Sequence, residues 1–232
     1  MEQPLIKKSR RKTTYKGADS KPPIAVIPKT PNQGLYVDAI VDSSQIIVLG
    51  PAGTGKTYIA ATFASSLYQQ KLIDKIIITR PNVSAGKSLG YFPGTLEEKM
   101  MPWVMPVLEV LHWHLGKGVV ETGIKNGNIE IAPFETMRGR SFRDAFVILD
   151  EAQNVTPHEM KMFLTRVGDN CKVILNGDIQ QSDLSEQSGL TKAIHMVKKH
   201  LIPVPIIEFT VDDIVRSDLC KKWIIAYMKE GM

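Results

Sequence analysis

Eight consecutive residues, GPAGTGKT from Gly50 to Thr57, have the types and spacing of a phosphate-binding loop, G-x-x-x-x-G-K-[ST]. The apolar run IIVL leads into them and YIAATFASSL follows, so a strand, a loop and a helix come in the order this motif requires. Glycines let the backbone turn its N–H groups toward phosphate oxygens, and the helix directs its positive end to the same place. The alternative is a glycine-rich turn that binds nothing, but eight compatible residues between a strand and a helix favour phosphate binding.

The loop predicts a site for a nucleoside triphosphate, taken as ATP, together with Mg²⁺. Lys56 is expected to reach the β- and γ-phosphates, and the Thr57 hydroxyl is expected to hold Mg²⁺. The residues of this loop predicted to bind ATP are Gly50, Pro51, Ala52, Gly53, Thr54, Gly55, Lys56 and Thr57.

Two carboxylates, Asp150 and Glu151, follow the apolar run Phe146 to Leu149, which has the form of a Walker B strand. Asp150 is expected to hold Mg²⁺ through water. Glu151 is expected to orient and polarise the attacking water, because phosphoryl transfer depends mainly on positioning and charge neutralisation. The alternative is an acidic helix start after a buried strand, and the phosphate-binding loop favours the catalytic pair.

A second polar element, GDIQQ from Gly177 to Gln181, follows another apolar run. A carbohydrate or nucleotide kinase has no need of such an element at the adjacent strand end, whereas a nucleic-acid motor uses one to sense the γ-phosphate. We therefore expect Gln181 to act as this sensor in catalysis. The alternative is that Gln180 or Gln181 only caps a helix.

Strand-like runs alternate with helical patterns, which predicts an α/β fold with a doubly wound, mainly parallel sheet. Ligands of such sheets bind at the carboxyl ends of the strands, and the suspected chemistry falls after four of them. Strands are expected near residues 46–49, 75–81, 128–133, 145–149, 172–178 and 206–210, and helices near 35–40, 57–67, 96–115, 157–167, 190–197 and 219–227.

Length and charge define one domain with a basic extension. The 232 residues, 43% of them hydrophobic, suffice for one substantial core and leave no room for a second full domain. Residues 1–21 contain seven Lys and Arg and two acidic residues, and since the chain has 29 basic and 24 acidic residues the remainder is electrically neutral. We expect a flexible basic arm over residues 1–29 and an ATPase domain over 30–232. The arm could contact nucleic acid or acidic partners, or simply solubilise the protein.

Two cysteines are too few for a disulfide scaffold or a zinc site. Neither a signal peptide nor an apolar span of about 18 residues is present. The sequence therefore predicts a soluble, cytoplasmic protein that does not use a membrane.

The longer strings around these motifs resemble the PhoH-like ATPases, which are related to the first RecA-like domain of superfamily 1 helicases. The resemblance covers about residue 30 to the C-terminus, through GPAGTGKT, ITRPNVSAGKSLGYFPGTLEEKM, IEIAPFETMRGRSFRDAFVILDEAQN, MKMFLTRVGDN, NGDIQQSDL and DDIVRSDL. It implies a RecA-like P-loop NTPase fold. Asn176 and Gln180 depart from the family pattern, which usually has Thr at both positions, and neither change removes a catalytic group.

The resemblance also assigns roles to single residues. Lys56 and Thr57 carry the Walker A roles, and Asp150 and Glu151 the Walker B roles. Gln181 is the glutamine of the GD-x-x-Q element. Gln33 is the adenine contact, at the distance upstream of the loop where many nucleic-acid motors place such a glutamine; the alternative for Gln33 is an ordinary surface residue.

The chain has no room for the second RecA-like domain that gives monomeric helicases their closing arginine. A ring in which a neighbouring copy inserts the arginine solves this problem, so we expect a homo-oligomer, with a hexameric ring favoured. Arg216 is the first candidate for this catalytic arginine, and Arg138 and Arg140 are the others. Each could equally be an ordinary surface or ion-pairing arginine.

The sequence thus favours Mg²⁺-dependent ATP hydrolysis by a helicase-related enzyme acting on RNA or single-stranded DNA. The side chains that could follow a nucleic-acid backbone are Arg80, Lys87, Arg138 and Arg140, with Trp103 among the stacking surfaces, although the neutral body counts against them. The alternative is an ATP-binding regulatory module that hydrolyses slowly and acts through partners. A small-molecule kinase is disfavoured by DEAQ and GD-x-x-Q.

Overall fold

Six parallel strands form a single sheet in the computed structural model, which describes residues 22–81, 96–137, 139, 141–184 and 187–230. The strand order is β3-β2-β4-β5-β1-β6. The crossovers place helices on both faces, so the predicted doubly wound α/β fold is confirmed. The strands are β1 (Gln45–Leu49), β2 (Lys75–Thr79), β3 (Ile129–Ile131), β4 (Ala145–Leu149), β5 (Cys171–Gly177) and β6 (Ile206–Glu208).

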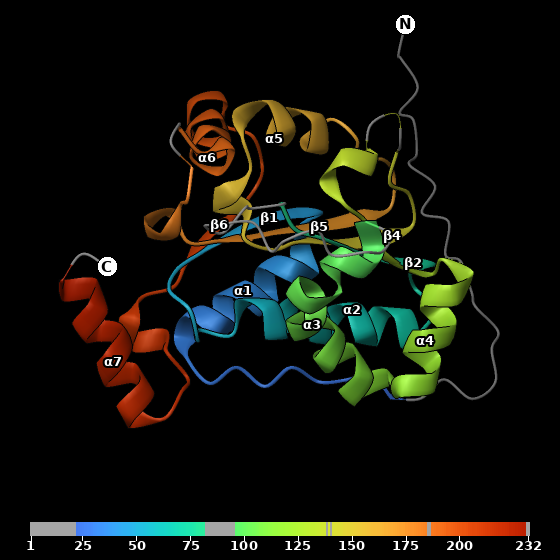
Figure 1. Cartoon of the computed structure of the whole chain (residues 1–232), viewed down its shortest axis with the longest axis horizontal. Helices are drawn as coiled ribbons and strands as arrows, with labels where there is room; N and C mark the ends of the chain where they lie inside the picture. The colour runs from blue at the N-terminus through green and yellow to red at the C-terminus, as the bar shows by residue number, and fades with distance from the viewer. Residues whose placement is uncertain (1–21, 82–95, 138, 140, 185–186, 231–232) are drawn as a thin grey trace, which may run out of the picture.

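The helices form two layers around the sheet (Figure 1). Helices α1 (Pro31–Asp42), α2 (Lys56–Gln69), α3 (Leu96–Leu115) and α4 (Lys117–Asn126) cover one face. Helices α5 (Pro157–Leu164) and α6 (Gly189–His200) cover the other, and α7 (Asp218–Lys229) projects at one side. Four 3-10 turns complete the described elements: η1 (Phe134–Met137), η2 (Ala152–Asn154), η3 (Ile179–Gln181) and η4 (Val211–Asp213).

The central strands β1, β2, β4 and β5 are apolar at most positions because both faces of the sheet are covered. Side chains alternate between the faces, so Ile46 and Val48 of β1 join the core with α2 and α3, whereas Ile47 and Leu49 join the core with α5 and α6. The five residues of β4 are all buried. Two hydrophobic layers therefore hold the sheet rigidly between the helices.

The register brings the ends of the central strands level. Leu49 of β1 pairs with Gly177 of β5, and Leu149 of β4 pairs with both Leu175 and Thr79. The segments that follow β1, β2, β4 and β5 consequently leave the sheet at one edge. The expectation that the suspected chemistry gathers at the carboxyl ends of these strands is confirmed.

Two helices differ from the expectation. Helix α4 falls in a segment for which the sequence predicted no element; Gly123 is needed there because a Cβ would lie 2.9 Å from the Ile129 side chain. Helix α7 was predicted from an apolar pattern, and yet none of its residues is buried. Its Trp223 is 58% exposed and stacks on Tyr227 at a ring-centroid distance of 5.9 Å. The pattern indicated the helix correctly, but not whether the apolar face is covered.

The described end of the predicted basic arm, residues 22–29, contacts the domain; residues 1–21 lie outside the described part. The Ile24 N–H donates to Ser66 Oγ at 3.1 Å, and Val26 packs against the core on the α2 side. Residues 22–29 therefore run along the folded body.

A buried carboxylate ties the start of α1 to η4, near the C-terminal end of the sheet. Asp213 is 3% exposed, and its Oδ2 accepts hydrogen bonds from Asn32 Nδ2 at 2.7 Å and from the Thr210 N–H at 2.8 Å. Burial alone would raise the pKa of Asp213, but hydrogen bonds from Thr210, Thr30 and Asn32 outweigh it and lower the pKa below its usual value. The ionised form is therefore the form that the fold stabilises.

Asp213→Asn is expected to lower the free energy of unfolding at pH 7 by about 1–3 kcal/mol, because hydrogen bonds to a buried carboxylate are lost. Since the folded pKa lies below the unfolded value, this stabilisation is present above about pH 3.9 and is lost as the pH falls through the folded pKa. Urea unfolding of both proteins from pH 7 to pH 3 should show the difference shrinking. A difference that stays constant over this range would contradict the assignment.

Candidate ATP-hydrolysis site

The phosphate-binding loop links β1 to α2 and depends on glycines in the left-handed region. Gly50, Gly53 and Gly55 have φ values of 139°, 83° and 90°. A Cβ on Gly50 would lie 2.6 Å from the backbone oxygen of Phe209, so the loop start leaves no room for a side chain. Thr54 Oγ1 donates to the Pro51 carbonyl at 3.0 Å and closes the turn. The loop is thus a cradle that side chains would fill.

Lys56 is the first residue of α2, and its ammonium group lies over the loop. Nζ donates to the carbonyl oxygens of Gly50 at 2.5 Å and Pro51 at 2.9 Å. Burial lowers the pKa of Lys56, and the nearby carboxylates of Asp178, Asp150 and Glu151 oppose this shift. Lys56 is therefore a largely buried cation among three carboxylates, at the edge of the sheet where the strands end.

Thr57 and Asp150 form the oxygen pair that the sequence predicted for Mg²⁺. Thr57 Oγ1 lies 3.2 Å from Asp150 Oδ1 and 3.3 Å from Oδ2, which brings residues 93 positions apart into contact. Burial raises the pKa of Asp150 and the Glu151 charge raises it further, whereas Arg80, Thr57 and Lys56 lower it. A divalent cation would offset the burial of this charge.

The donor set fits Mg²⁺ held jointly with a substrate. Mg²⁺ prefers oxygen ligands and binds through one or two protein oxygens together with phosphates and water. Hydroxyl and carboxylate oxygens are what Thr57 and Asp150 offer. Among the described residues, no group of three or more His, Cys, Asp or Glu side chains could hold a metal by itself.

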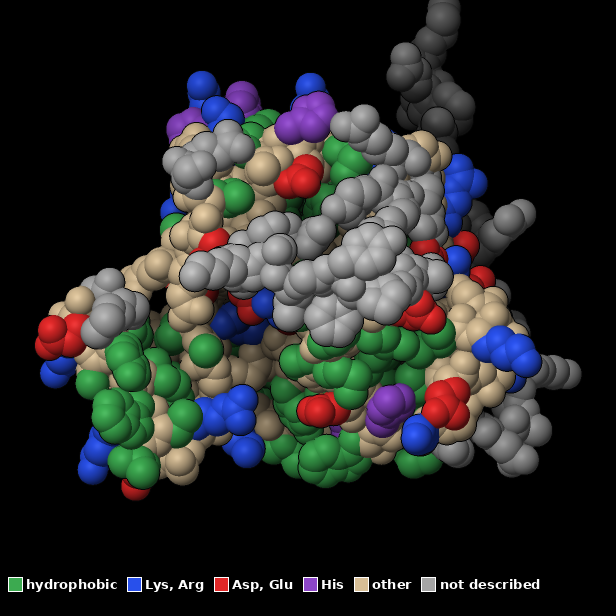
Figure 2. Space-filling view, viewed as in Figure 1, with side chains coloured by type: hydrophobic (Ala, Val, Ile, Leu, Met, Phe, Trp, Pro, Cys, Tyr) green, Lys and Arg blue, Asp and Glu red, His purple; other side chains and the backbone are tan. Residues whose placement is uncertain are grey.

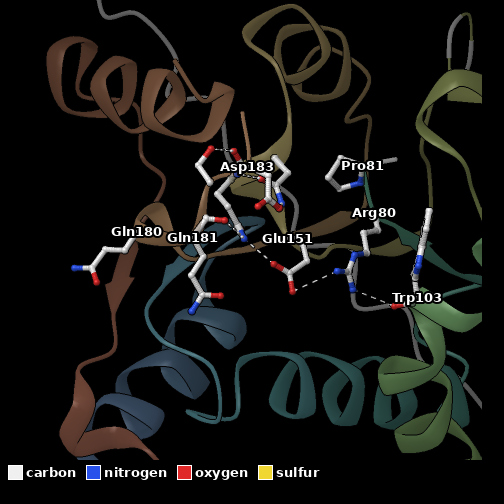
Figure 3. Close-up of a pocket in the computed structure, with 10 residues that line it drawn as sticks. Arg80, Pro81, Trp103, Glu151, Gln180, Gln181 and Asp183 are labelled. Atoms are coloured by element: carbon white, nitrogen blue, oxygen red, sulfur yellow. Dashed lines mark hydrogen bonds and ion pairs between the residues drawn. The ribbon is translucent and has the colours of Figure 1, made fainter. Parts of the chain in front are cut away.

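Glu151 follows Asp150 and has both carboxylate oxygens engaged. Its φ of 53° lies in the left-handed region, which marks a sharp change of direction after β4. Oε2 accepts a hydrogen bond from Gln153 Nε2 at 2.6 Å, and Oε1 lies 3.7 Å from Arg80 Nη2 (Figure 3). The candidate general base is therefore held from two sides.

Gln153 is a site residue to which the sequence analysis gave no role of its own. It is 1% exposed, its Oε1 accepts from the Asp178 N–H at 3.0 Å, and its Nε2 also lies 3.5 Å from the Gln181 carbonyl oxygen. A Cβ on Gly177 would lie 2.5 Å from Leu190 Cδ2 and 3.1 Å from Gln153 Oε1, so a side chain at this position would disturb the packing around Gln153. One amide thus connects Glu151 to the GDIQQ segment. Only its place in the string DEAQ could have drawn attention to it.

The predicted sensor, Gln181, is exposed and lies at the end of η3. The cap of η3 is Asp178, whose Oδ1 accepts from the Gln180 N–H at 3.1 Å. Neither Gln180 nor Gln181 has a described side-chain capping contact, so the structure does not favour the alternative that these amides only cap a helix. The role of Gln181 as a sensor stays a prediction.

A cleft of about 510 Å³ opens beside Glu151 (Figure 3). Arg80 and Trp103 form one side of it, and Arg80 Nη1 donates to the Trp103 carbonyl at 3.3 Å. Of the four predicted nucleic-acid contacts, only Arg80 lies in the described part of the chain, and Lys87, Arg138 and Arg140 lie outside it. The cleft is lined by Arg80, Pro81, Trp103, Glu151, Gln153, Asn154, Gln180, Gln181, Ser182 and Asp183.

Gln33 is not an ordinary surface side chain, since only 4% of it is exposed. Its Nε2 donates to the Thr54 carbonyl at 2.9 Å and its Oε1 accepts from the Lys29 N–H at 2.8 Å. Gln33 therefore supports the phosphate-binding loop directly. Its predicted contact with adenine stays a prediction.

Arg216 lies against the phosphate-binding loop of its own chain. The Val215 N–H donates to the Gly53 carbonyl at 3.0 Å, and a Cβ on Gly53 would lie 2.9 Å from Arg216 Cγ. The sequence argument had offered Arg216 to a neighbouring copy. In the structure it is placed beside its own site, and a role in a neighbour's site stays a prediction.

The departure at Asn176 concerns a buried position. Asn176 is fully buried opposite Val48 in β1, and among the described residues its Nδ2 and Oδ1 have no hydrogen-bond partner.

Comparison with known proteins identifies the family of this chain. The model of the family described as PhoH-like protein matches residues 25–228. The chain belongs to the PhoH-like family. It is 47% identical to a PhoH-like protein of Bacillus subtilis over 205 residues and 44% identical to one of Mycobacterium tuberculosis over 204 residues. It is also 43% identical to Protein PhoH of Escherichia coli over 213 residues.

The PhoH-like chain described here covers only part of these relatives. The three alignments take in 88%, 87% and 90% of this chain, but 64%, 58% and 60% of the relatives. Among solved structures, the Pif1 helicase from Candida albicans matches with a TM-score of 0.41 and 16% identity, over 80% of this chain and 40% of that one. Similarity at that level is too low to indicate a shared function. In the described ranges, no helix is both long and apolar enough to cross a bilayer.

Proposed function

We propose that this PhoH-like domain is a Mg²⁺-dependent ATPase that acts on RNA or single-stranded DNA as a homo-oligomer. The observation that carries the proposal is the contact of Thr57 with Asp150, at 3.2 Å between Oγ1 and Oδ1. It joins the end of β4 to the start of α2 beside Lys56. Motifs of the Walker A and Walker B types thus meet where phosphoryl transfer requires them to meet.

Each side chain has a distinct task in hydrolysis. Lys56 binds the phosphates as a cation, and Thr57 and Asp150 hold the metal. Bound Mg²⁺ would neutralise negative charge that develops on the phosphate during transfer. Glu151 orients the attacking water through a carboxylate oxygen and accepts its proton. Gln153 keeps Glu151 and the GDIQQ segment in a fixed relation, through bonds of 2.6 Å to Glu151 Oε2 and 3.0 Å to the Asp178 N–H.

Nucleic acid is assigned to the cleft beside Glu151. Arg80 offers a guanidinium group to a phosphate, and Trp103 offers a ring for base stacking. The cleft shares Glu151 and Gln181 with the hydrolysis site, so an occupant would contact the groups that act on the γ-phosphate. These shared residues support a nucleic-acid motor in which binding of the nucleic acid and hydrolysis of ATP influence each other.

A contact between copies is assigned to α7. Hydrophobic side chains gather over this helix in Figure 2, and Leu219, Trp223 and Tyr227 are 67%, 58% and 51% exposed. An apolar face of this kind commonly marks a protein interface. The apolar face of α7 supports the homo-oligomer, with a hexameric ring favoured. The arginine that would act between copies stays to be identified.

The test is ATP hydrolysis by the purified protein with and without single-stranded RNA and DNA. We expect one polymer to stimulate turnover, and we expect the stimulation to be absent from Glu151→Gln. Turnover that no polymer changes would instead favour the second candidate, an ATP-binding regulatory module with slow hydrolysis. The near-neutral charge of the body is the observation that keeps this candidate open.

A further inference from the structure

Arg80 contacts the carboxylate that is proposed to activate water. The two residues leave neighbouring strands at the same level, because Thr79 of β2 pairs with Leu149 of β4. Arg80 Nη2 lies 3.7 Å from Glu151 Oε1, while Gln153 Nε2 donates to Oε2 at 2.6 Å (Figure 3). Both oxygens of Glu151 are thus drawn to side chains that line the cleft.

The ion pair is open to competition from the cleft. The Arg80 and Glu151 side chains are 28% and 36% exposed, and both line the cavity of about 510 Å³. The second anchor of Arg80 is one neutral group, the Trp103 carbonyl, at 3.3 Å from Nη1. A partly exposed pair of this length is weak, whereas a phosphate meets a guanidinium group with two parallel hydrogen bonds.

We propose that Arg80 is a positioning residue that restrains Glu151, and that a phosphate of single-stranded nucleic acid in the cleft takes Arg80 away and frees the carboxylate. The proposal rests on the proposed function and specifies how strand binding stimulates hydrolysis. While Arg80 Nη2 faces Oε1 and Gln153 holds Oε2, neither carboxylate oxygen of Glu151 is free to contact a water molecule. With Arg80 on a phosphate, the free oxygen of Glu151 can accept a proton from water.

The test compares Arg80→Gln with the wild-type chain at saturating Mg²⁺ and ATP, with no polymer and with poly(U) or oligo(dT). Glutamine has no charge, so the polymer-free kcat is expected to rise about 1.5-fold to fivefold, the range that a weak ion pair allows. The KM for ATP is expected to stay unchanged, and stimulation by polymer is expected to disappear. Arg80→Lys keeps the charge and should return the polymer-free rate toward that of the wild type.

Lys75→Gln is the matched control, since Lys75 lies at the other end of the same strand. Its Nζ pairs with Glu130 Oε2 at 3.3 Å, far from the cleft. Its loss should change neither the polymer-free rate nor the rate with polymer. A polymer-free rate of Arg80→Gln that is unchanged or lower would overturn the restraint and leave Arg80 as a strand contact or as a support for Glu151.

The two proposals can fail separately. If neither polymer stimulates the wild type, the nucleic-acid function fails, and with it the release step. A raised polymer-free rate in Arg80→Gln would still support the restraint of Glu151, since that measurement uses no nucleic acid.

Discussion

Replacing Glu151 with glutamine is expected to lower ATP turnover by about 10²- to 10⁴-fold, the usual contribution of a positioned general base. Glutamine has nearly the same shape, and its oxygen can still accept the 2.6 Å hydrogen bond from Gln153. It cannot accept a proton from water at neutral pH. Nucleotide affinity should be retained, because the substitution leaves Lys56 and the phosphate-binding loop unchanged. Phosphate release and titration with a fluorescent ATP analogue measure the two quantities.

Glu121→Gln makes the same chemical change away from the site. Glu121 is exposed on α4, where it pairs with Lys117 at 3.7 Å, and its loss should leave turnover unchanged. Turnover by Glu151→Gln within a fewfold of the wild type would remove Glu151 from the mechanism. A loss of nucleotide affinity equal to the loss of turnover would instead indicate a damaged loop.

Replacing Lys56 with alanine is expected to lower both ATP affinity and turnover, with turnover per ATP concentration falling by about 10²-fold or more. The reason is that the Lys56 ammonium group is the cation of the phosphate-binding loop. It donates hydrogen bonds to the carbonyls of Gly50 and Pro51. The fold should survive, since burial lowers the pKa of Lys56 and the charged side chain is held at a cost. Steady-state kinetics measures the loss of ATP affinity and turnover, and a thermal melt checks that the fold survives.

Lys172 is the matched control because it too donates to main-chain carbonyls. Its Nζ bonds to the carbonyls of Ile40, Val41 and Ser43 at the end of α1, on the opposite edge of the sheet. Lys172→Ala should lower the melting temperature and leave turnover per folded molecule intact. If Lys56→Ala behaved in the same way, Lys56 would be structural rather than a phosphate ligand.

The alternation of strands and helices along the chain, and the edge of the sheet that carries the site, could be predicted because they depend on local patterns. A continuous apolar run such as Ile46 to Leu49 specifies a buried parallel strand, and the glycines of the loop specify φ values that other residues rarely adopt. Thr57 and Asp150 were paired in advance because the chemistry of Mg²⁺ requires their oxygens to meet. These features need no knowledge of distant contacts.

Other features depend on tertiary contacts that the sequence does not display. Gln153 gains its place from the register that brings β4 beside β5, and Arg80 meets Glu151 only because β2 and β4 are neighbours. Arg216 was only a candidate for a neighbouring copy's site, and its motif does not reveal that the Val215 N–H bonds to the Gly53 carbonyl of the same chain. The exposure of α7 is likewise decided by what else packs there.

The most direct test of the account is a crystal structure of this chain with Mg²⁺ and a non-hydrolysable ATP analogue. The account predicts that the phosphates lie in the loop of residues 50–57, with Mg²⁺ at Thr57 and Asp150. Lys56 should then have left the carbonyls of Gly50 and Pro51 for the phosphates. A nucleotide bound elsewhere, or a metal that contacts neither Thr57 nor the water around Asp150, would contradict it.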